Sequence, residues 1–247
     1  MIDQRHQREI EHGKLLASKG AESIWGWDSP AGKVRAQRRA TLILSKLPEA
    51  SHASALEIGC GTGDFTRIFA TTINRLTAVD ISEELLTIAR KNLSDMVNVE
   101  FILSSFEAIP CTDLYDAVIG SSVLHHLEIM PALSQIYRLL KPGGVISFAE
   151  PNMLNPQIMV QKNIPWIKKR MGDSPDETAF FRWQISRRLE EVGFVEIHVT
   201  PFDWLHPLIP QPLIKAVSLF GKFLERTPLF NEFAGSLMIS AKKGLTQ

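Results

Sequence analysis

The chain has 247 residues, 45% of them hydrophobic, and its 27 basic and 27 acidic residues give a formal net charge of zero. This composition predicts a globular protein with a hydrophobic core, and the balanced charge argues against a protein that binds nucleic acid along its phosphate backbone. Cys60 and Cys111 are too few for a disulfide framework or a cysteine-ligated metal site, which favours a reducing, cytoplasmic setting.

Residues 1–52 precede the first predicted strand, and we expect them to form a helical lid or cap segment. Their first residues are polar, and no apolar run in the chain reaches the length of a spanning helix, which argues against secretion and membrane insertion. The stretch Trp25-Gly-Trp-Asp-Ser-Pro30 predicts a helix start, with Ser29 as the N-cap and Pro30 in the first helical position.

Trp25 and Trp27 beside a glycine suggest a lid over a ligand cleft. Arg38 or Arg39, in the helix that follows, could bind an anionic group of the ligand. The alternative is a solvated basic helix face, with both tryptophans packed on the core.

Beyond residue 53, short β-rich runs alternate with helical patterns, which predicts a parallel sheet with helices on its faces. The predicted strands cover residues 55–58, 76–80, 99–103, 117–120, 145–149, 195–200 and 236–242. Ser82 can cap one helix, Lys141-Pro-Gly-Gly144 ends a second, and Gly193 ends a third. We expect an α/β fold with a doubly wound, mostly parallel seven-stranded sheet and accessory helical segments.

One domain is expected over residues 53–247, because no linker divides this part of the chain. Insertions at about 151–177 and 203–235 depart from the strand–helix alternation. Within the second, residues 212–226 form a helix with one apolar stripe. Such a helix could lie on a membrane surface or pair with a partner, but we expect it to cover the core or a substrate cleft.

The stretch SALEIGCGTGDFT, residues 54–66, places Gly59, Gly61 and Gly63 between a strand and a helix. This order forms a binding site for a negatively charged group, because the start of a helix offers free N–H groups. It differs from the dinucleotide fingerprint, since Asp64 takes the place of the last glycine, and the phosphate loop of nucleotide hydrolases is absent. Asp80, at the end of the second strand, is placed to accept hydrogen bonds from a ribose diol.

Five motifs occur in order along residues 54–150: LEIGCGTGDF, AVDIS, SSFEAIP, YDAVIGSSVLHHL and LKPGGVISFAE. Together they resemble the class I S-adenosylmethionine-dependent methyltransferases, especially the small-molecule group called type 11. The resemblance implies a Rossmann-like methyltransferase fold, S-adenosyl-L-methionine as cofactor, and an enzyme that methylates a small molecule.

The resemblance also implies a set of cofactor-binding residues. Glu57 and the loop Gly59-Cys60-Gly61 would surround the methionine portion, Asp80 would bind the ribose, Ile81 would pack on the adenine, and Ser121 would lie near the methionine amine. Ser105 stands where the family usually has an acidic residue, so adenine recognition would depend more on backbone groups around Ser105 and Phe106.

His125 and His126 follow the fourth strand, and either could be a general base for the acceptor. The alternative is packing and hydrogen bonding within the loop. The remaining histidines show no ligand spacing, so no metal is expected. Asn152 and Asn155 follow the fifth strand and could orient a polar substrate, or they could form Asx-turns before the prolines.

The sequence therefore predicts a methyltransferase whose acceptor pocket lies between the Trp25–Arg39 segment, the Glu150–Asn155 turn and the insertion after Phe202, with Trp166 and Trp204 adding aromatic surface. Oxygen, nitrogen and carbon acceptors all stay open. The alternatives are a cofactor-binding regulatory or scaffolding protein without chemistry, and a nucleic-acid methyltransferase. The expected partner is a small molecule, with no nucleic acid, no favoured membrane contact, and a monomer or homodimer as the assembly.

Overall fold

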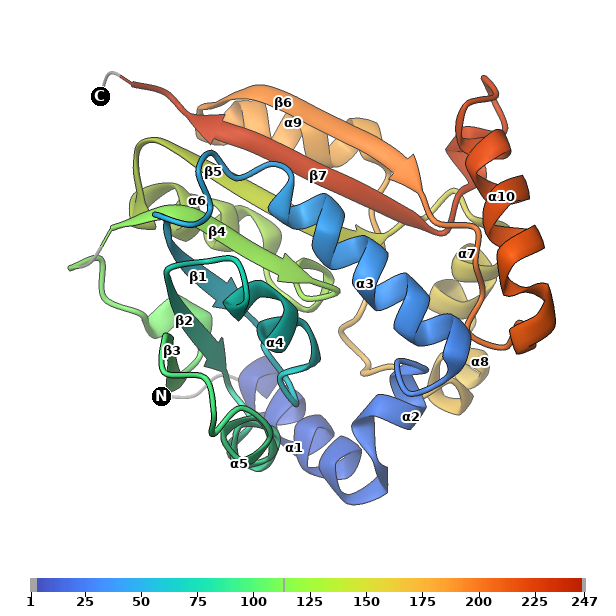
Figure 1. The fold of residues 1–247 in the computed structure, drawn as a ribbon, viewed down its shortest axis with the longest axis horizontal. Coiled ribbons are helices and arrows are strands. Elements are labelled where there is room, and N and C mark those ends of the chain that lie inside the picture. Colours follow the sequence, from blue (N-terminus) through green and yellow to red (C-terminus); the bar gives the residue numbers. More distant parts are fainter. Residues whose placement is uncertain (1–3, 113, 246–247) are drawn as a thin grey trace.

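Seven strands form one sheet in the order β3-β2-β1-β4-β5-β7-β6 in the computed structural model, which describes residues 4–112 and 114–245 (Figure 1). The strands are β1 (Ser54–Ile58), β2 (Arg75–Asp80), β3 (Val99–Leu103), β4 (Tyr115–Ser121), β5 (Leu140–Pro151), β6 (Phe194–Phe202) and β7 (Ser236–Lys243). Strands β1 to β5 pair in parallel, whereas β7 runs antiparallel to both β5 and β6. The predicted fold, a mostly parallel seven-stranded sheet, is confirmed.

The predicted strands agree closely with those of the structure. The central strands β1 and β2 are buried almost throughout, as expected of parallel strands covered on both faces. The largest difference lies in β5, which extends beyond the predicted 145–149 at both ends. Its later residues, as far as Pro151, pair with β7 across the antiparallel ladder, so the strand continues further than its apolar run.

Ten helices surround the sheet within the described residues. They are α1 (Gln4–Lys19), α2 (Ala21–Trp25), α3 (Pro30–Leu44), α4 (Asp64–Ala70), α5 (Glu83–Asn92), α6 (Ile129–Leu139), α7 (Pro156–Asn163), α8 (Pro165–Arg170), α9 (Arg182–Val192) and α10 (Ile214–Glu225). The predicted caps are present: the Ser29 hydroxyl accepts a hydrogen bond from the Gly32 N–H at 2.9 Å, and that of Ser82 accepts one from the Leu85 N–H at 3.3 Å.

Two hydrophobic cores lie on the two faces of the sheet. On one face, Leu133 of α6 and Ile185 of α9 pack with the strand residues Leu56 and Val118. On the other, α3 and α4 pack on neighbouring residues of the same strands. Successive side chains of a strand point to opposite faces, so each strand contributes to both cores, and the sheet is covered on both sides.

The helices outside the doubly wound core gather near the carboxyl edge of the sheet (Figure 1). α1 packs against α5, and a side chain at Gly13 would collide with Ser82 at 2.6 Å, so glycine permits this close approach. α7 and α8 follow β5, and α10 lies beyond them, between β6 and β7 in the chain. No helix within the described parts of the chain is long and apolar enough to cross a bilayer.

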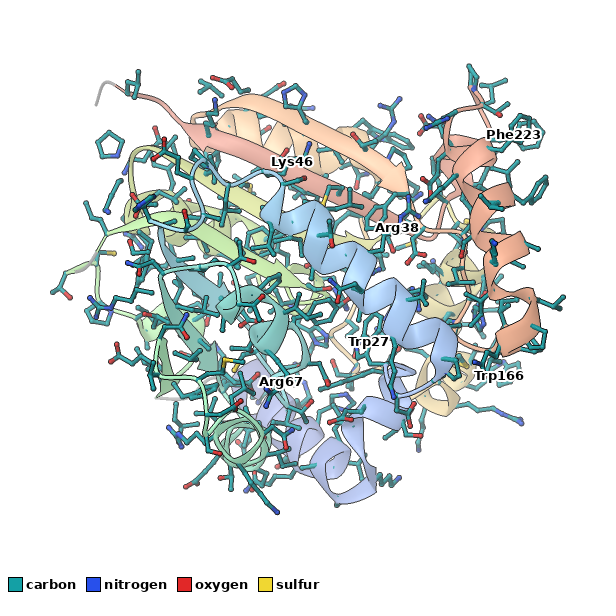
Figure 2. All side chains as sticks on the ribbon, viewed as in Figure 1. Trp27, Arg38, Lys46, Arg67, Trp166 and Phe223 are labelled. Atoms are coloured by element: carbon teal, nitrogen blue, oxygen red, sulfur yellow. The ribbon has the colours of Figure 1, made fainter. Side chains whose placement is uncertain are left out.

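The predicted apolar stripe of α10 consists of Leu213, Val217, Phe220 and Leu224, and only part of it is covered. Leu213, just before the helix, is 52% exposed and Phe220 is 61% exposed, whereas Val217 and Leu224 are half-buried. The expectation that this stripe covers a core or cleft is therefore wrong for Leu213 and Phe220. Phe223, outside the stripe, lies on the side of α10 that faces away from the sheet (Figure 2). The close contact to the domain comes instead from Gly221, where a side chain would meet Trp204 at 2.9 Å.

Candidate functional site

A cavity of about 720 Å³ lies at the carboxyl ends of β1, β2 and β4. Its wall combines the glycine loop after β1 with side chains from α1, the α2–α3 connection, the turn after β4, and residues 203–208 after β6. Open parallel sheets bind ligands at this edge. The core thus contributes one wall and the accessory segments contribute the others.

The glycine loop and Asp80 form the centre of the first wall. Gly59 and Gly61 have φ values of 67° and 54°, a left-handed conformation that favours glycine. Asp80 accepts hydrogen bonds from the Gly61 N–H at 2.8 Å and from the Ser82 N–H at 2.9 Å, one on each carboxylate oxygen. Because each oxygen has a second lone pair, Asp80 can still accept two hydrogen bonds from a ligand diol in the cavity.

Glu57 lies behind the loop and does not line the cavity. Its side chain is buried, and Oε2 has no hydrogen-bond partner among the described residues. Burial, reinforced by the nearby charge of Asp80, raises the pKa of Glu57 to about 8. A buried carboxyl oxygen without a hydrogen-bond partner is unusual, and this one lies directly behind the loop that lines the cavity.

The other predicted cofactor residues all lie on the cavity wall: Cys60, Ile81, Ser105, Phe106 and Ser121. Cys60 is buried, and burial raises the pKa of its thiol, so it is an inert wall residue. Next to Ser121, Ser122 has a φ of 58°, which is costly for a residue other than glycine. This conformation turns the chain sharply between β4 and the histidines that follow.

Trp25 and Trp27 both line the cavity. A Cβ at Gly61 would lie 3.0 Å from the indole of Trp25, so Trp25 covers the glycine loop directly, as a lid would. Trp27 instead packs edge-on against Phe65 of α4, with ring centroids 5.3 Å apart, and this contact fixes its place in the cavity wall.

Arg39 does not form the solvated basic face that was one alternative for this helix, because it is buried. It donates hydrogen bonds to the hydroxyls of Ser121 and Ser122 and lies 3.6 Å from the Asp203 carboxylate. Burial lowers the pKa of Arg39 to about 10, which leaves it charged at neutral pH. Arg38, the other candidate for anion binding, is paired with Glu225 of α10.

The two asparagines after β5 have structural contacts. The Asn152 amide is buried and donates to the carbonyls of Glu232 and Ala234, both at 2.8 Å. Asn155 lines the cavity, but its side chain caps α7 by accepting from the N–H groups of its first turn. These contacts favour the Asx-turn alternative over substrate binding. Trp166 is 66% exposed and does not line the cavity, so its expected place in the pocket is wrong.

A cluster of histidines and carboxylates also lines the cavity. His125 is buried, and its Nδ1 lies 2.7 Å from Glu150 Oε2. His126 lies 3.0 Å from Glu9 of α1 through its own Nδ1. Glu177, from the segment before α9, lies 3.8 Å from the Nε2 atom of each ring. Both histidines predicted as catalytic therefore reach the cavity wall, where acidic partners hold them.

The carboxylates organise this part of the site. Burial acts to raise the pKa of Glu150, but the hydrogen bond with His125 and the N–H groups of Val123 and Leu124 lower it below its ordinary value. Burial also acts to raise the pKa of Glu177. The adjacent histidines and Lys162 outweigh this effect and lower the pKa below its ordinary value. Glu150 thus stays ionised and fixes the turn η2 (Leu124–His126) onto the end of β5.

Sequence reasoning did not identify Glu9, Lys162 or Glu177 as part of the site. They lie on α1, α7 and the segment before α9, and side-chain contacts at such separations leave no local pattern.

The residues of the first wall fit S-adenosylmethionine. Asp80 offers a pair of acceptor oxygens for a ribose diol, and the glycines allow close approach of a ligand to the backbone.

Comparisons with known proteins identify the kind of domain that the chain carries. Residues 56–148 match the protein family described as a methyltransferase domain. The chain is 27% identical over 135 residues to nodulation protein S of Rhizobium tropici, covering 53% of this chain and 57% of the relative. It is 33% identical over 110 residues to the malonyl-[acyl-carrier protein] O-methyltransferase of Pectobacterium atrosepticum, covering 43% of this chain and 42% of the relative. The matches thus span about half the length of these curated relatives.

Solved structures share the fold over most of both chains. The N-methyltransferase NodS of Bradyrhizobium japonicum, in complex with S-adenosylhomocysteine, superposes with a TM-score of 0.56 at 18% identity, over 87% of this chain and 89% of NodS. The [4+2]-cyclase SpnF superposes with a TM-score of 0.68 at 17% identity, over 95% and 96% of the two chains. At these identities the likeness establishes the fold alone.

Proposed function

Because the chain carries a class I S-adenosylmethionine-dependent methyltransferase domain, we propose that it transfers a methyl group from this cofactor to a small-molecule acceptor. One observation carries the proposal: the glycine loop with Asp80 and the histidine–carboxylate cluster line the same cavity. A cofactor held by the glycine loop and Asp80 would share this cavity with an acceptor held beside the histidines. The volume of about 720 Å³ suits two small molecules better than a polymer strand.

The bound cofactor supplies an electrophilic methyl group. The protein would orient it: Asp80 would accept from the ribose hydroxyls, and the Gly59–Gly61 backbone would lie against the amino-acid portion, with Glu57 behind that loop. Ile81 and Phe106 line the part of the wall where the resemblance places the adenine. Alignment of two bound reactants supplies much of the acceleration of such a transfer, so no dedicated triad is required.

The acceptor pocket is proposed between Trp25, Trp27, the histidine cluster and the residues after β6, including Trp204 and His206, all of which line the cavity. Trp25 excludes water from the glycine loop by lying directly against it. An acceptor that must lose a proton would need a base, and His126 and His125 are the candidates by position. The N-methyltransferase NodS and the malonyl-[acyl-carrier protein] O-methyltransferase named above differ in the kind of atom that they methylate, so the proposal extends only to small molecules as a class.

The proposal is tested with methyl-labelled S-adenosylmethionine and a bacterial metabolite extract, followed by separation of small molecules from protein and nucleic acid. We expect label in the small-molecule fraction, and loss of transfer in Asp80→Ala. His198→Ala, which changes an exposed histidine of β6, is the matched control and should retain transfer. Label found only in nucleic acid would favour the nucleic-acid alternative, and cofactor binding without transfer to any fraction would favour a regulatory or scaffolding protein.

A further inference from the structure

The ring nitrogens of His125 and His126 converge on one carboxylate. The Nε2 atom of His125 lies 3.8 Å from Glu177 Oε2, and that of His126 lies 3.8 Å from Glu177 Oε1. One ligand atom from each of the three residues lies within 4.8 Å of the others. Bonds of about 2.1 Å to one ion would place such atoms roughly 3 Å apart, so small side-chain movements would complete a shared site.

The opposite nitrogen of each ring is already held by a carboxylate. His125 Nδ1 lies 2.7 Å from Glu150 Oε2, and His126 Nδ1 lies 3.0 Å from Glu9 Oε2. An Nδ1–H that donates to a carboxylate leaves Nε2 as the free lone pair, which fixes the ring's tautomer and orientation. This is the arrangement by which proteins orient metal-binding histidines. It occurs here twice, with both Nε2 atoms directed at the same carboxylate.

Negative charge predominates around the two rings. Glu9, Glu150 and Glu177 contact them, and the Lys162 ammonium, 2.5 Å from Glu177 Oε2, offsets part of this charge. Asp173 lies 3.0 Å from the same ammonium and adds another carboxylate. Buried carboxylates need nearby cations, and a divalent ion between the rings and Glu177 would add positive charge to that of Lys162 and of Arg5, which donates to the His126 carbonyl.

We propose that His125, His126 and Glu177 bind a divalent transition-metal ion at the cavity wall. Two imidazole nitrogens and one carboxylate oxygen are the protein ligands of His2Glu zinc sites and of non-haem iron(II) sites. The ligands come from the turn after β4 and from the segment before α9, so the spacing of histidines along the sequence does not indicate the site.

Three protein ligands leave coordination positions open toward the cavity, because all three residues line it. An acceptor with an oxygen donor, such as a hydroxyl or carboxylate, would take one of them, and a hydroxyl bound to the ion would lose its proton more readily. This second step rests on the proposed function. In this step the histidines bind the ion and do not act as the base, and the acceptor loses its proton because it is coordinated to the ion.

The positive charge of Lys162 beside Glu177 provides a direct test of the metal site. Its ammonium forms an ion pair with Oε2 of Glu177, and at this position it would repel a bound cation. Removal of this charge should therefore strengthen metal binding, whereas damage to the cluster's structure would weaken it. Lys162→Gln removes the charge and keeps a polar side chain, shorter by one atom.

The experiment uses tag-free, chelator-treated full-length protein titrated with Co²⁺, monitored by visible absorption, and with Zn²⁺, monitored by calorimetry. We expect one ion per chain with a micromolar or tighter Kd, at least about tenfold weaker binding in Glu177→Gln and in Glu9→Gln, and tighter binding in Lys162→Gln. His198→Ala, an exposed histidine far along the chain on β6, should bind as the unchanged protein does.

Absence of stoichiometric binding to the unchanged protein would overturn the proposal, as would binding that Glu177→Gln leaves unchanged. If Glu177→Gln fails to fold, Lys162→Gln decides: equal or weaker binding would contradict the site, and tighter binding would support it. Metal binding is measured without an acceptor, so failure here leaves the methyl-transfer proposal standing, and failure of methyl transfer leaves this one standing.

Discussion

The carboxylate of Asp80, at the end of β2, lies 2.8 Å from the main-chain nitrogen of Gly61 and ties that strand to the glycine loop after β1. Asp80→Ala removes both this contact and the acceptor proposed for the ribose. We expect S-adenosylhomocysteine binding to weaken by about 1–3 kcal/mol, measured by calorimetry. The matched control is Asp116→Ala, an aspartate of β4 that binds the Ser54 N–H and Lys141 away from the cavity. Equal loss of affinity in both variants would contradict the assignment.

A valine at Gly61 tests whether the glycine loop contacts the cofactor, and a valine at another glycine controls for backbone strain. Gly61→Val places a side chain at a φ of 54° and against the Trp25 indole, so we expect loss of cofactor binding with the circular dichroism spectrum retained. Gly20→Val is the control, because Gly20 also has a positive φ, 83°, but has no atom near its side-chain position. Both variants are strained, and only Gly61→Val should lose binding. Retained affinity in Gly61→Val would place the ligand elsewhere.

Glu57 should make stability depend on pH. Its pKa is about 8 in the folded protein and near 4.5 for an ordinary glutamate, so between these values the folded state keeps a proton that the unfolded chain has released. The free energy of unfolding therefore falls as pH rises through this window, by up to ~1.4 kcal/mol per pH unit. Glu57→Gln removes this dependence. Urea unfolding of the unchanged protein and of Glu57→Gln at pH 5, 6.5 and 8 measures this dependence. If the free energy of unfolding changed with pH in the same way in both proteins, Glu57 would not be protonated in the folded state.

Arg39 and Asp203 link α3 to the segment after β6. Arg39→Met leaves the buried Asp203 with Arg35, 3.0 Å away, and deprives two site hydroxyls of their donor. We expect a loss of about 1–3 kcal/mol in the free energy of unfolding, measured with denaturant, because two half-buried hydroxyls lose a charged donor while Asp203 keeps Arg35. Arg67, labelled in Figure 2, is 45% exposed and pairs with Asp95 at the surface, and Arg67→Met should leave stability unchanged within error. Similar losses in both would argue against burial as the cause.

The parts of the fold that follow from local patterns could be predicted from the sequence. Runs of apolar residues mark buried strands, and Ser82 and Gly193 mark helix ends, because caps and periodicity are properties of neighbouring residues. The glycine loop and Asp80 could be placed together because the carboxyl ends of parallel strands share one edge of the sheet.

Other features depend on contacts between distant segments. Nothing near Arg39 indicates that Asp203 would pair with it in the interior. Likewise, the stripe on α10 was expected to be covered because apolar stripes usually are, yet Leu213 and Phe220 of this stripe are exposed. Glu9 and Glu177 join the histidines only because α1 and the segment before α9 meet at the cavity. Such contacts are set by how accessory segments pack on the core, which periodicity does not record.

The position of β7 between β5 and β6 has a consequence for the order in which the molecule assembles. Strands β1 to β5 can pair as they leave the ribosome, since each finds its neighbour among residues already made. β6 cannot, because its partner in the sheet is β7, and residues 236–243 are synthesised later. Until then the edge of β5 stays open to other chains. Productive folding therefore depends on a late insertion step, and slow translation after β6 would prolong the aggregation-prone interval.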